Sequence, residues 1–255
     1  MAHTSVRSVD ILGVEIDAMT MPLALEIVES AVQDREKVQF AFCTVHTLVE
    51  SQDEPRLASA INNAVACPDG MPLVWLCRLK GARSTHRVYG PDATLALCEY
   101  GVSRGWRHYF YGSTEDTVKA LAQSLTQRFP GLQVAGYYSP PFRQLTPEED
   151  EAIVAQINAA RPDLVWVGLG MPKQELWMAE HAPRLEAPVV LAVGAAFDFH
   201  SGVKRQAPRW MQKSGLEWLF RLSQEPGRLW RRYLIGNTRF LWLLFRELLP
   251  WRHRR

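Results

Sequence analysis

Three short stretches of the chain place polar side chains directly after apolar runs that are typical of buried β-strands. FCTVHT supplies Thr44 and His46, ACPDGMP supplies Asp69, and YFYGST turns through Gly112 toward a helix. Carboxylates and imidazoles are groups that enzymes often use to move protons. If these strand ends lie together, they can provide a base that acts on a bound ligand.

A fourth stretch, LVWVGLGMPKQELW at 164–177, leaves its apolar run through Gly170 and then presents Lys173, Gln174 and Glu175. Glycine lets a backbone come close to a ligand, and the first N–H groups of a helix attract anions. Two interpretations stand here: a plain strand-to-helix turn, or a ligand site at the carboxyl edge of a sheet.

Taken one at a time, these residues have ordinary structural explanations. Asp-Gly after a proline is a common turn, so Asp69 can serve the backbone alone. Gly112 fits a sharp strand-to-helix bend, and His46 fits a histidine whose hydrogen bonds are satisfied at a strand end. The chain completes neither a GxGxxG nor a GxxxxGK[ST] phosphate loop. Their common placement is what would make them a site.

The elements that must position these residues form a regular alternation of β-prone runs and amphipathic helical segments. This rhythm predicts an α/β fold with a Rossmann-like, mainly parallel sheet flanked by helices, and ligands bind such sheets where the strands end. Ser113, before an acidic first turn, and Thr146, before Pro147, mark two helix starts. The predicted strands are 38–45, 63–68, 107–112, 132–138, 164–170 and 188–194, and the predicted helices include 21–34, 113–129 and 146–160.

Composition narrows the class of protein. A chain of 255 residues, 47 % of them hydrophobic, can form one large or two modest domains. No run is apolar for long enough to span a membrane, and the N-terminus lacks the apolar core of a signal peptide. The cysteines form neither a CxxC pair nor a cluster with His at metal-ligand spacing, which argues against a disulfide framework and a zinc site. We therefore expect a cytoplasmic protein in a reducing compartment.

The C-terminal part of the chain differs from the body in charge. From Lys204 onward it carries thirteen Lys and Arg against three Asp and Glu, so its formal charge is about +10, against about −8 for the rest. It also holds nine aromatic residues. We predict an α/β catalytic domain at 1–203 and a basic, Trp- and Arg-rich helical appendage at 204–255.

The appendage contains one long amphipathic segment between Arg228 and Leu249. At helical spacing its apolar residues share one stripe, and its arginines lie opposite. The helix either packs this stripe on the body, or it lies in a membrane interface with its arginines on lipid phosphates. The stripe comprises Trp230, Tyr233, Leu234, Phe240, Leu241, Leu244, Phe245 and Leu248, and the arginines are Arg228, Arg231, Arg232, Arg239 and Arg246.

Along nearly its whole length the chain resembles the WecG/TagA/CpsF family of bacterial glycosyltransferases. The motifs that carry the resemblance are PDGMPLVW, RVYGPD, VGLGMPKQE, VGAAFDFHSG and APRWMQKSGLEWLFRLSQEPGRLWRRY. The resemblance implies an inverting, metal-independent transfer of a sugar from a UDP-sugar to a polyprenyl-diphosphate-linked acceptor, for cell-surface polysaccharides. The donors that it implies are UDP-N-acetylmannosamine, its uronic acid and UDP-glucose. The absence of a DxD motif agrees with the expectation that no metal is needed.

The resemblance also implies roles for residues in the body. Asp69 matches the catalytic base of the family and Thr44 matches a threonine beside it. Arg87, in RVYG, matches an arginine that contacts a phosphate or the acceptor. His46 stands where Asn is expected, which bears on the choice of donor sugar, and Gln206 departs from an arginine of many relatives.

The nucleotide-sugar pocket is expected to draw on three of the segments already quoted. Lys173 and Gln174 offer donors at a helix start, and Gln174 or Glu175 would contact nucleoside or sugar. Gly112 and Gly170 would let the backbone come close to the ligand. Asp198 is a sugar or ribose contact or, alternatively, a helix cap.

In the appendage, Arg221, Arg228 and Arg231 match arginines that reach the acceptor's diphosphate, for which guanidinium geometry is suited. The expected partners are the donor, the lipid-linked acceptor, an anionic membrane surface on the inner face of the cell membrane, and a second copy of the chain. Two other classes stay as alternatives: a nicotinamide-dependent oxidoreductase on the same type of sheet, and a nucleic-acid-binding module that uses the basic aromatic tail.

Overall fold

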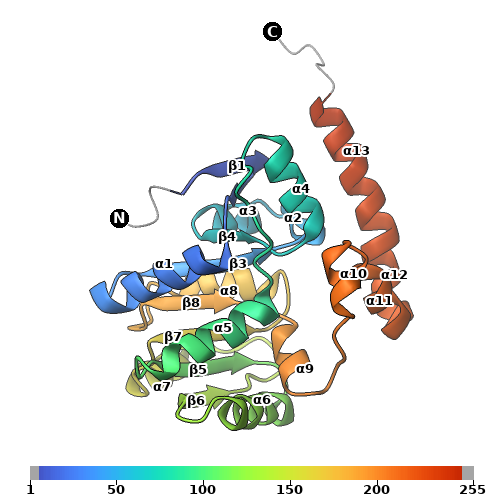
Figure 1. The fold of residues 1–255 in the computed structure, drawn as a ribbon. Helices are drawn as coiled ribbons and strands as arrows, with labels where there is room; N and C mark the ends of the chain where they lie inside the picture. The colour runs from blue at the N-terminus through green and yellow to red at the C-terminus, as the bar shows by residue number, and fades with distance from the viewer. Residues whose placement is uncertain (1–5, 249–255) are drawn as a thin grey trace.

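A computed structural model describes residues 6–248 of the chain. Its centre is a six-stranded, all-parallel sheet in the order β4-β3-β8-β7-β5-β6 (Figure 1). All six predicted strands are confirmed, although β3, β7 and β8 each end two residues earlier than expected and β4 begins two residues later. Their bounds are β3 (Val38–Cys43), β4 (Val65–Pro68), β5 (Arg107–Gly112), β6 (Gln133–Tyr138), β7 (Leu164–Gly168) and β8 (Val189–Ala192).

Helices cover both faces of the sheet, as the Rossmann-like prediction requires. Side chains alternate between two cores along each strand, so that Phe110 packs on one face and Tyr111 on the other. This two-sided burial explains why the strands read as continuous apolar runs. One core is covered by α2 (Val45–Ser51), α3 (Pro55–Asn62), α7 (Pro147–Ala159) and α8 (Lys173–His181), and the other by α1 (Met21–Asp34), α5 (Gly90–Val102), α6 (Glu115–Arg128) and α9 (Ala196–His200).

Two of the helix starts test the capping predictions. Thr146 caps α7 in a capping box with Glu149, as predicted. The prediction for α6 was wrong by one residue: Ser113 has a left-handed φ of 58° after the turn at Gly112, and Thr114 is the cap that accepts from the Thr117 N–H at 3.3 Å. Because Ser113 adopts the left-handed turn, the N-cap is the next residue, Thr114.

The N-terminal segment forms a hairpin that the sequence patterns did not predict. β1 (Ser8–Ile11) and β2 (Val14–Asp17) pair antiparallel through a turn at Leu12 and Gly13, both with positive φ. Asp17 accepts a hydrogen bond from the Ala66 N–H at 2.8 Å, which attaches the hairpin to β4. The strands are only four residues long, which is why period-two alternation was too short to notice.

The connections diverge at the carboxyl edge of the sheet. β3 is followed by α2 on one face, whereas its neighbour β8 is followed by α9 on the other. Neighbouring strands that send the chain to opposite faces open a crevice at their ends, which is where such sheets bind ligands. The four polar stretches singled out in the sequence all follow strands at this edge.

The C-terminal helices lie beside this edge (Figure 1, orange to red). They are α10 (Arg209–Lys213), α11 (Glu217–Gln224), α12 (Pro226–Trp230), a π-helical turn (Arg231–Ile235) and α13 (Gly236–Leu248), and α4 (Met71–Leu79) is their neighbour on the body. Two ion pairs hold α13 on the body, Arg239 with Asp53 and Lys80 with Glu247. None of the helices within residues 6–248 combines the length and apolar character that a membrane-spanning helix needs.

The prediction of one apolar stripe on this segment was wrong. Tyr233 and Phe240 are buried against the body, but Trp230, Leu234 and Leu241 are exposed, together with Phe245 and Trp242. The π-helical turn at Arg231–Ile235 changes the angular spacing in the middle of the segment, so a uniform 100° per residue does not describe it. The side chain of Leu248 and the whole of Leu249 lie outside the described part of the chain.

Candidate active site

Asp69 lies in the turn where β4 ends, beside the end of β3. The backbone N–H groups of Asp69 and Gly70 both donate to the Cys43 carbonyl, at 2.9 and 3.2 Å. The Asp69 Oδ2 accepts from the Gly90 N–H at the start of α5, at 3.1 Å, and Oδ1 lies 3.4 Å from Arg87 Nη2. The carboxylate is thus held in one orientation, with 14 % of the side chain still exposed.

The surroundings of Asp69 make it a stronger base than an ordinary aspartate. Burial raises the pKa of Asp69 to about 6, because the charged form loses water. Arg87 and the Gly90 N–H act in the opposite direction, and Glu217 raises the pKa further. At neutral pH the carboxylate is mostly ionised and yet holds a proton well, which suits a general base.

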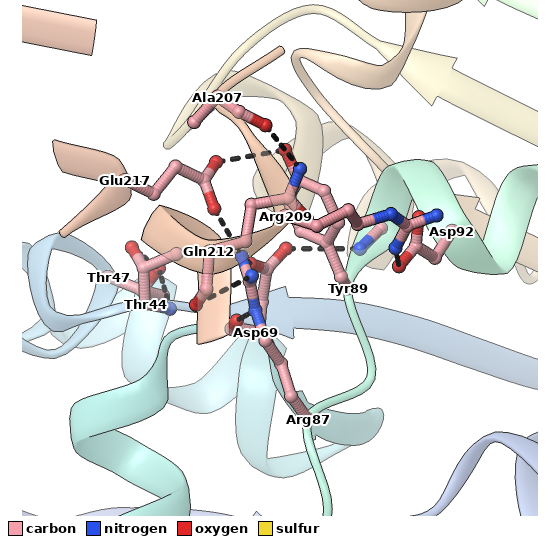
Figure 2. Close-up of polar contacts among 11 residues, drawn as sticks. Thr44, Thr47, Asp69, Arg87, Tyr89, Asp92, Ala207, Arg209, Gln212 and Glu217 are labelled. Atoms are coloured by element: carbon pink, nitrogen blue, oxygen red, sulfur yellow. Dashed lines mark hydrogen bonds and ion pairs between the residues drawn. The ribbon is translucent and has the colours of Figure 1, made fainter. Parts of the chain in front are cut away.

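Arg87 is shared between Asp69 and a second carboxylate, Glu217, which comes from α11 of the appendage (Figure 2). Arg87 Nη2 donates to Glu217 Oε2 at 2.6 Å, and the Tyr89 hydroxyl donates to Oε1 at 2.9 Å. The guanidinium also lies over the Tyr89 ring, 4.0 Å from its centre. Glu217 lies in the stretch APRWMQKSGLEWLFRLSQEPGRLWRRY, where no role was predicted for it, and only its place in that motif could have marked it.

Thr44 lies beside the Asp69 turn, as predicted. It is the residue before α2, and its N–H donates to the Thr47 hydroxyl at 3.0 Å (Figure 2). A Cβ added to Gly70 would lie 3.6 Å from the Thr44 Cα, which shows how closely the two turns approach. The Thr44 hydroxyl lies 3.3 Å from the Thr47 hydroxyl and can still serve a ligand.

His46 occupies the first turn of α2 rather than a loop after the strand. Burial, followed by the positive charges of Arg232 and Arg221, lowers its pKa to about 3. The imidazole is therefore neutral at physiological pH and is a much weaker base than Asp69. Its proximity to Arg232 and Arg221 places His46 where the body meets the appendage.

The stretch quoted at 164–177 forms a turn with buried polar groups. Gln174 accepts from the Gly170 N–H at 3.1 Å and donates to the Ala192 carbonyl at 3.1 Å and to Glu175 at 2.9 Å. These bonds connect β8 with the start of α8, whereas Lys173 is exposed. Both interpretations of the stretch thus retain support, the turn through Gln174 and the ligand site through Lys173.

Glu175 differs from Gln174 in its hydrogen bonding. The side chain is 1 % exposed and its Oε2 has no partner among the described residues. Burial raises its pKa to about 7. A buried carboxyl oxygen without a partner is costly, and a ligand hydroxyl or amide would satisfy it.

Two other predicted pocket residues have structural explanations in the fold. A Cβ on Gly112 would lie 2.6 Å from the backbone of Gly168, so glycine is needed there for β5 and β7 to approach. Asp198 pairs with Lys204 at 2.7 Å, and its expected ligand contact stays a prediction.

The appendage arginines differ in their partners: Arg228 and Arg231 contact the appendage itself, whereas Arg221 contacts the body. Arg228 pairs with Glu225, and Arg231 lies over the Trp230 ring. Arg221 faces the body, near Phe199. Arg232, which the sequence predictions left out of the site, has a buried Nε without a partner in the described residues.

Burial lowers the pKa of Arg232 to about 10, and the nearby charges of Arg221 and Arg228 act in the same direction. A buried, partly unsatisfied guanidinium beside two further arginines is a site for an anion. The three arginines come from three successive elements, α11, α12 and the π-helical turn, so no single helical period in the sequence marks Arg232. The edge of the sheet thus brings together Asp69, a carboxylate whose raised pKa suits a general base, and arginines that can hold a phosphate.

Comparisons with known proteins agree with this chemistry. The sequence model of the "Glycosyl transferase WecG/TagA/CpsF family" matches residues 9–254. Three similar proteins are each named N-acetylglucosaminyldiphosphoundecaprenol N-acetyl-beta-D-mannosaminyltransferase. The protein of Bacillus subtilis (strain 168) is 34% identical over 66% of this chain and 63% of its own length. That of Bacillus spizizenii is 29% identical over 72% and 70%, and that of Staphylococcus aureus (strain MW2) is 26% identical over 90% and 89%. The chain therefore belongs to the WecG/TagA/CpsF family of glycosyltransferases.

Proposed function

We propose that this protein transfers a sugar from a UDP-sugar to a polyprenyl-diphosphate-linked saccharide, with inversion at the anomeric carbon. The observation that carries the proposal is Asp69, a fixed carboxylate with a raised pKa at the carboxyl edge of a parallel sheet. The names of the three relatives, which act on an N-acetylglucosaminyl-diphosphoundecaprenol, support a lipid-linked acceptor. The family match supports neither the oxidoreductase nor the nucleic-acid alternative.

The mechanism that we propose is a single displacement. An acceptor hydroxyl oxygen attacks the anomeric carbon while Asp69 takes its proton. The bond between the anomeric carbon and the UDP oxygen breaks, and its electron pair leaves with UDP. One displacement on the opposite face of the sugar inverts the configuration.

The charge of the leaving group needs cations near the sheet edge. Arg87 beside Asp69, Lys173 at the start of α8 and the arginines of the appendage are the cations available there. In this proposal Lys173 serves the donor, and Arg221, Arg228, Arg231 and Arg232 serve the acceptor's diphosphate. Transfer without a metal ion is part of the proposal.

The donor sugar is expected to be N-acetylmannosamine, its uronic acid or glucose. The names of the relatives favour N-acetylmannosamine. His46 and the carboxyl group of Glu175 are the side chains of this chain that we expect to discriminate among the three.

The appendage is proposed to dock on an anionic membrane at the inner face of the cell membrane. Its outward side exposes Trp230, Leu241, Trp242 and Phe245, with arginines between them. Aromatic side chains beside basic ones suit the boundary between headgroups and acyl chains. Docking there would bring the sheet edge to a lipid-linked acceptor.

The reaction can be tested by measuring UDP release from a panel of UDP-sugars, with a short-chain polyprenyl-diphosphate-sugar in detergent. We expect release from one donor that depends on the acceptor. Asp69→Asn should lower turnover by about a hundredfold or more and leave donor binding nearly unchanged. Asp92→Asn is the matched control, because Asp92 pairs with Arg209 at the protein surface. A fully active Asp69→Asn variant would show that Asp69 is not the base, and absence of release from every donor would contradict the proposed reaction.

A further inference from the structure

We propose that Glu217 is a positioning residue, which holds Arg87 away from Asp69 and so keeps the catalytic carboxylate basic. The consequence of this inference for catalysis rests on the proposed function. The interaction itself involves only three side chains of this chain, those of Glu217, Arg87 and Asp69. No sequence motif assigns Glu217 this role, because its partners lie far away in the chain, with Arg87 130 positions before Glu217.

The contacts of Arg87 show a competition between two carboxylates. Its Nη2 is 2.6 Å from Glu217 and 3.4 Å from Asp69, so the stronger charge-assisted bond goes to the appendage. Arg87 also donates through Nε to the Asp69 backbone carbonyl and through Nη1 to the Gln212 carbonyl. The backbone bond keeps the guanidinium beside the base, while Glu217 determines where its charge lies.

Glu217 is itself held in one orientation. Its two oxygens have different partners, Arg87 and the Tyr89 hydroxyl, and its side chain is only 14 % exposed (Figure 2). Tyr89 and Arg87 come from the same strap of the body, the segment that leads into α5. One carboxylate of α11 therefore fixes both side chains of that strap over Asp69.

The consequence for the base follows from the charges around Asp69. Without the Glu217 charge, Asp69 loses a negative neighbour, and Arg87 is free to form a short ion pair with it. Both changes stabilise the carboxylate and weaken it as a base. The groups that face Asp69 are Arg87 and Tyr89 from the strap, the Gly90 N–H from α5, Glu217 from α11, and the Cys43 and Cys67 thiols from β3 and β4.

The proposal can be tested without any substrate. Carbon-13 NMR of labelled aspartate carboxyls follows the titration of Asp69, whose signal is assigned as the one missing from Asp69→Asn. We expect Glu217→Gln to lower the pKa of Asp69 by about one unit. Glu247→Gln is the matched control, since it removes another appendage carboxylate, on α13, which pairs with Lys80 of the body. It should leave the Asp69 titration unchanged.

The pH profile of kcat/KM gives the catalytic readout. In Glu217→Gln the acid limb should move to lower pH by the same amount, and the plateau should fall about tenfold because the base is weaker. A merely structural role for Glu217 would lower the plateau and leave the limb in place.

An Asp69 that titrates at the same pH in native protein and Glu217→Gln would overturn the proposal. If circular dichroism shows that Glu217→Gln does not fold, Glu217→Asp replaces it, because the shorter carboxylate keeps its charge but cannot reach Arg87. Its Asp69 pKa should then shift downward by a smaller amount, and no shift would again contradict the proposal. A native chain that releases no UDP would remove the proposed reaction, whereas the NMR result would stand.

Discussion

In the α/β body most of the large aromatic side chains are buried, whereas in the C-terminal helices half of the described ones are exposed. Trp166 and Phe110 have no exposed surface, but Trp230 is 43%, Trp242 54% and Phe245 61% exposed. The body is built around two cores, and of the described buried residues in those cores only Phe240 comes from the C-terminal helices. The appendage is held by a few buried side chains, by ion pairs and by the link between Glu217 and Arg87.

This difference matters because the site draws on both regions. The proposed base, Asp69, comes from the sheet edge, and the groups proposed to tune it and to provide positive charge come largely from the C-terminal helices. Elements with few buried contacts open most readily. We therefore expect that a shift of the appendage strongly changes the rate of the reaction but only slightly changes the stability of the protein.

The largest expected effect is a difference between the body and the appendage in how much an aromatic-to-alanine substitution lowers the free energy of unfolding. Trp166→Ala should lower the free energy of unfolding by about 3–5 kcal/mol, because it leaves a large cavity between fully packed strands. Trp242→Ala, on the exposed side of α13, should change it by less than about 0.5 kcal/mol. Urea unfolding followed by circular dichroism measures both, and equal losses would contradict the contrast between body and appendage.

A second comparison concerns membranes. Trp242→Ala should weaken binding to vesicles that contain anionic lipid by roughly tenfold, because one large aromatic side chain no longer enters the interface. Phe142→Ala is the matched control, since Phe142 is 88% exposed on the body, and it should bind normally. Sedimentation with vesicles measures the affinity, and stronger competition by oligonucleotides than by vesicles would favour the nucleic-acid alternative.

The smallest expected effect compares Arg232, an arginine of the appendage whose Nε is buried, with Arg231, an exposed one. Arg232→Met should raise KM for the lipid-linked acceptor by about tenfold, since a cation for its diphosphate is lost. Thermal stability should not fall, because the variant removes a buried charge that lacks a carboxylate partner. Arg231 lies over the exposed Trp230 ring, and Arg231→Met should raise KM for the acceptor less than Arg232→Met does. A larger increase in Arg231→Met would show that Arg231, and not Arg232, binds the acceptor's diphosphate.

Much of the fold could be predicted because it depends on local patterns. The six strands and the first helix follow from apolar runs and helical periodicity, and the placement of Thr44 and Asp69 follows from the common carboxyl edge of a parallel sheet. The hairpin at Ser8–Asp17 escaped prediction because its strands are too short to show a period.

Other features depend on contacts between distant segments. Glu217 and Arg232 look like ordinary charged residues of a basic helix until the appendage packs against the sheet edge. The single apolar stripe was a fair prediction for a regular helix, and the π-helical turn at Arg231–Ile235 made it wrong.

The sequence by itself determined the alternation of strands and helices, the turn that holds Asp69, and the charge contrast between body and tail, because each is set by neighbouring residues. Only the tertiary structure decided which groups surround Asp69, and therefore its pKa of about 6. It also decided which side of the appendage faces the site. Burial and charge act through space, and the residues that supply them to Asp69 come from segments far apart in the chain.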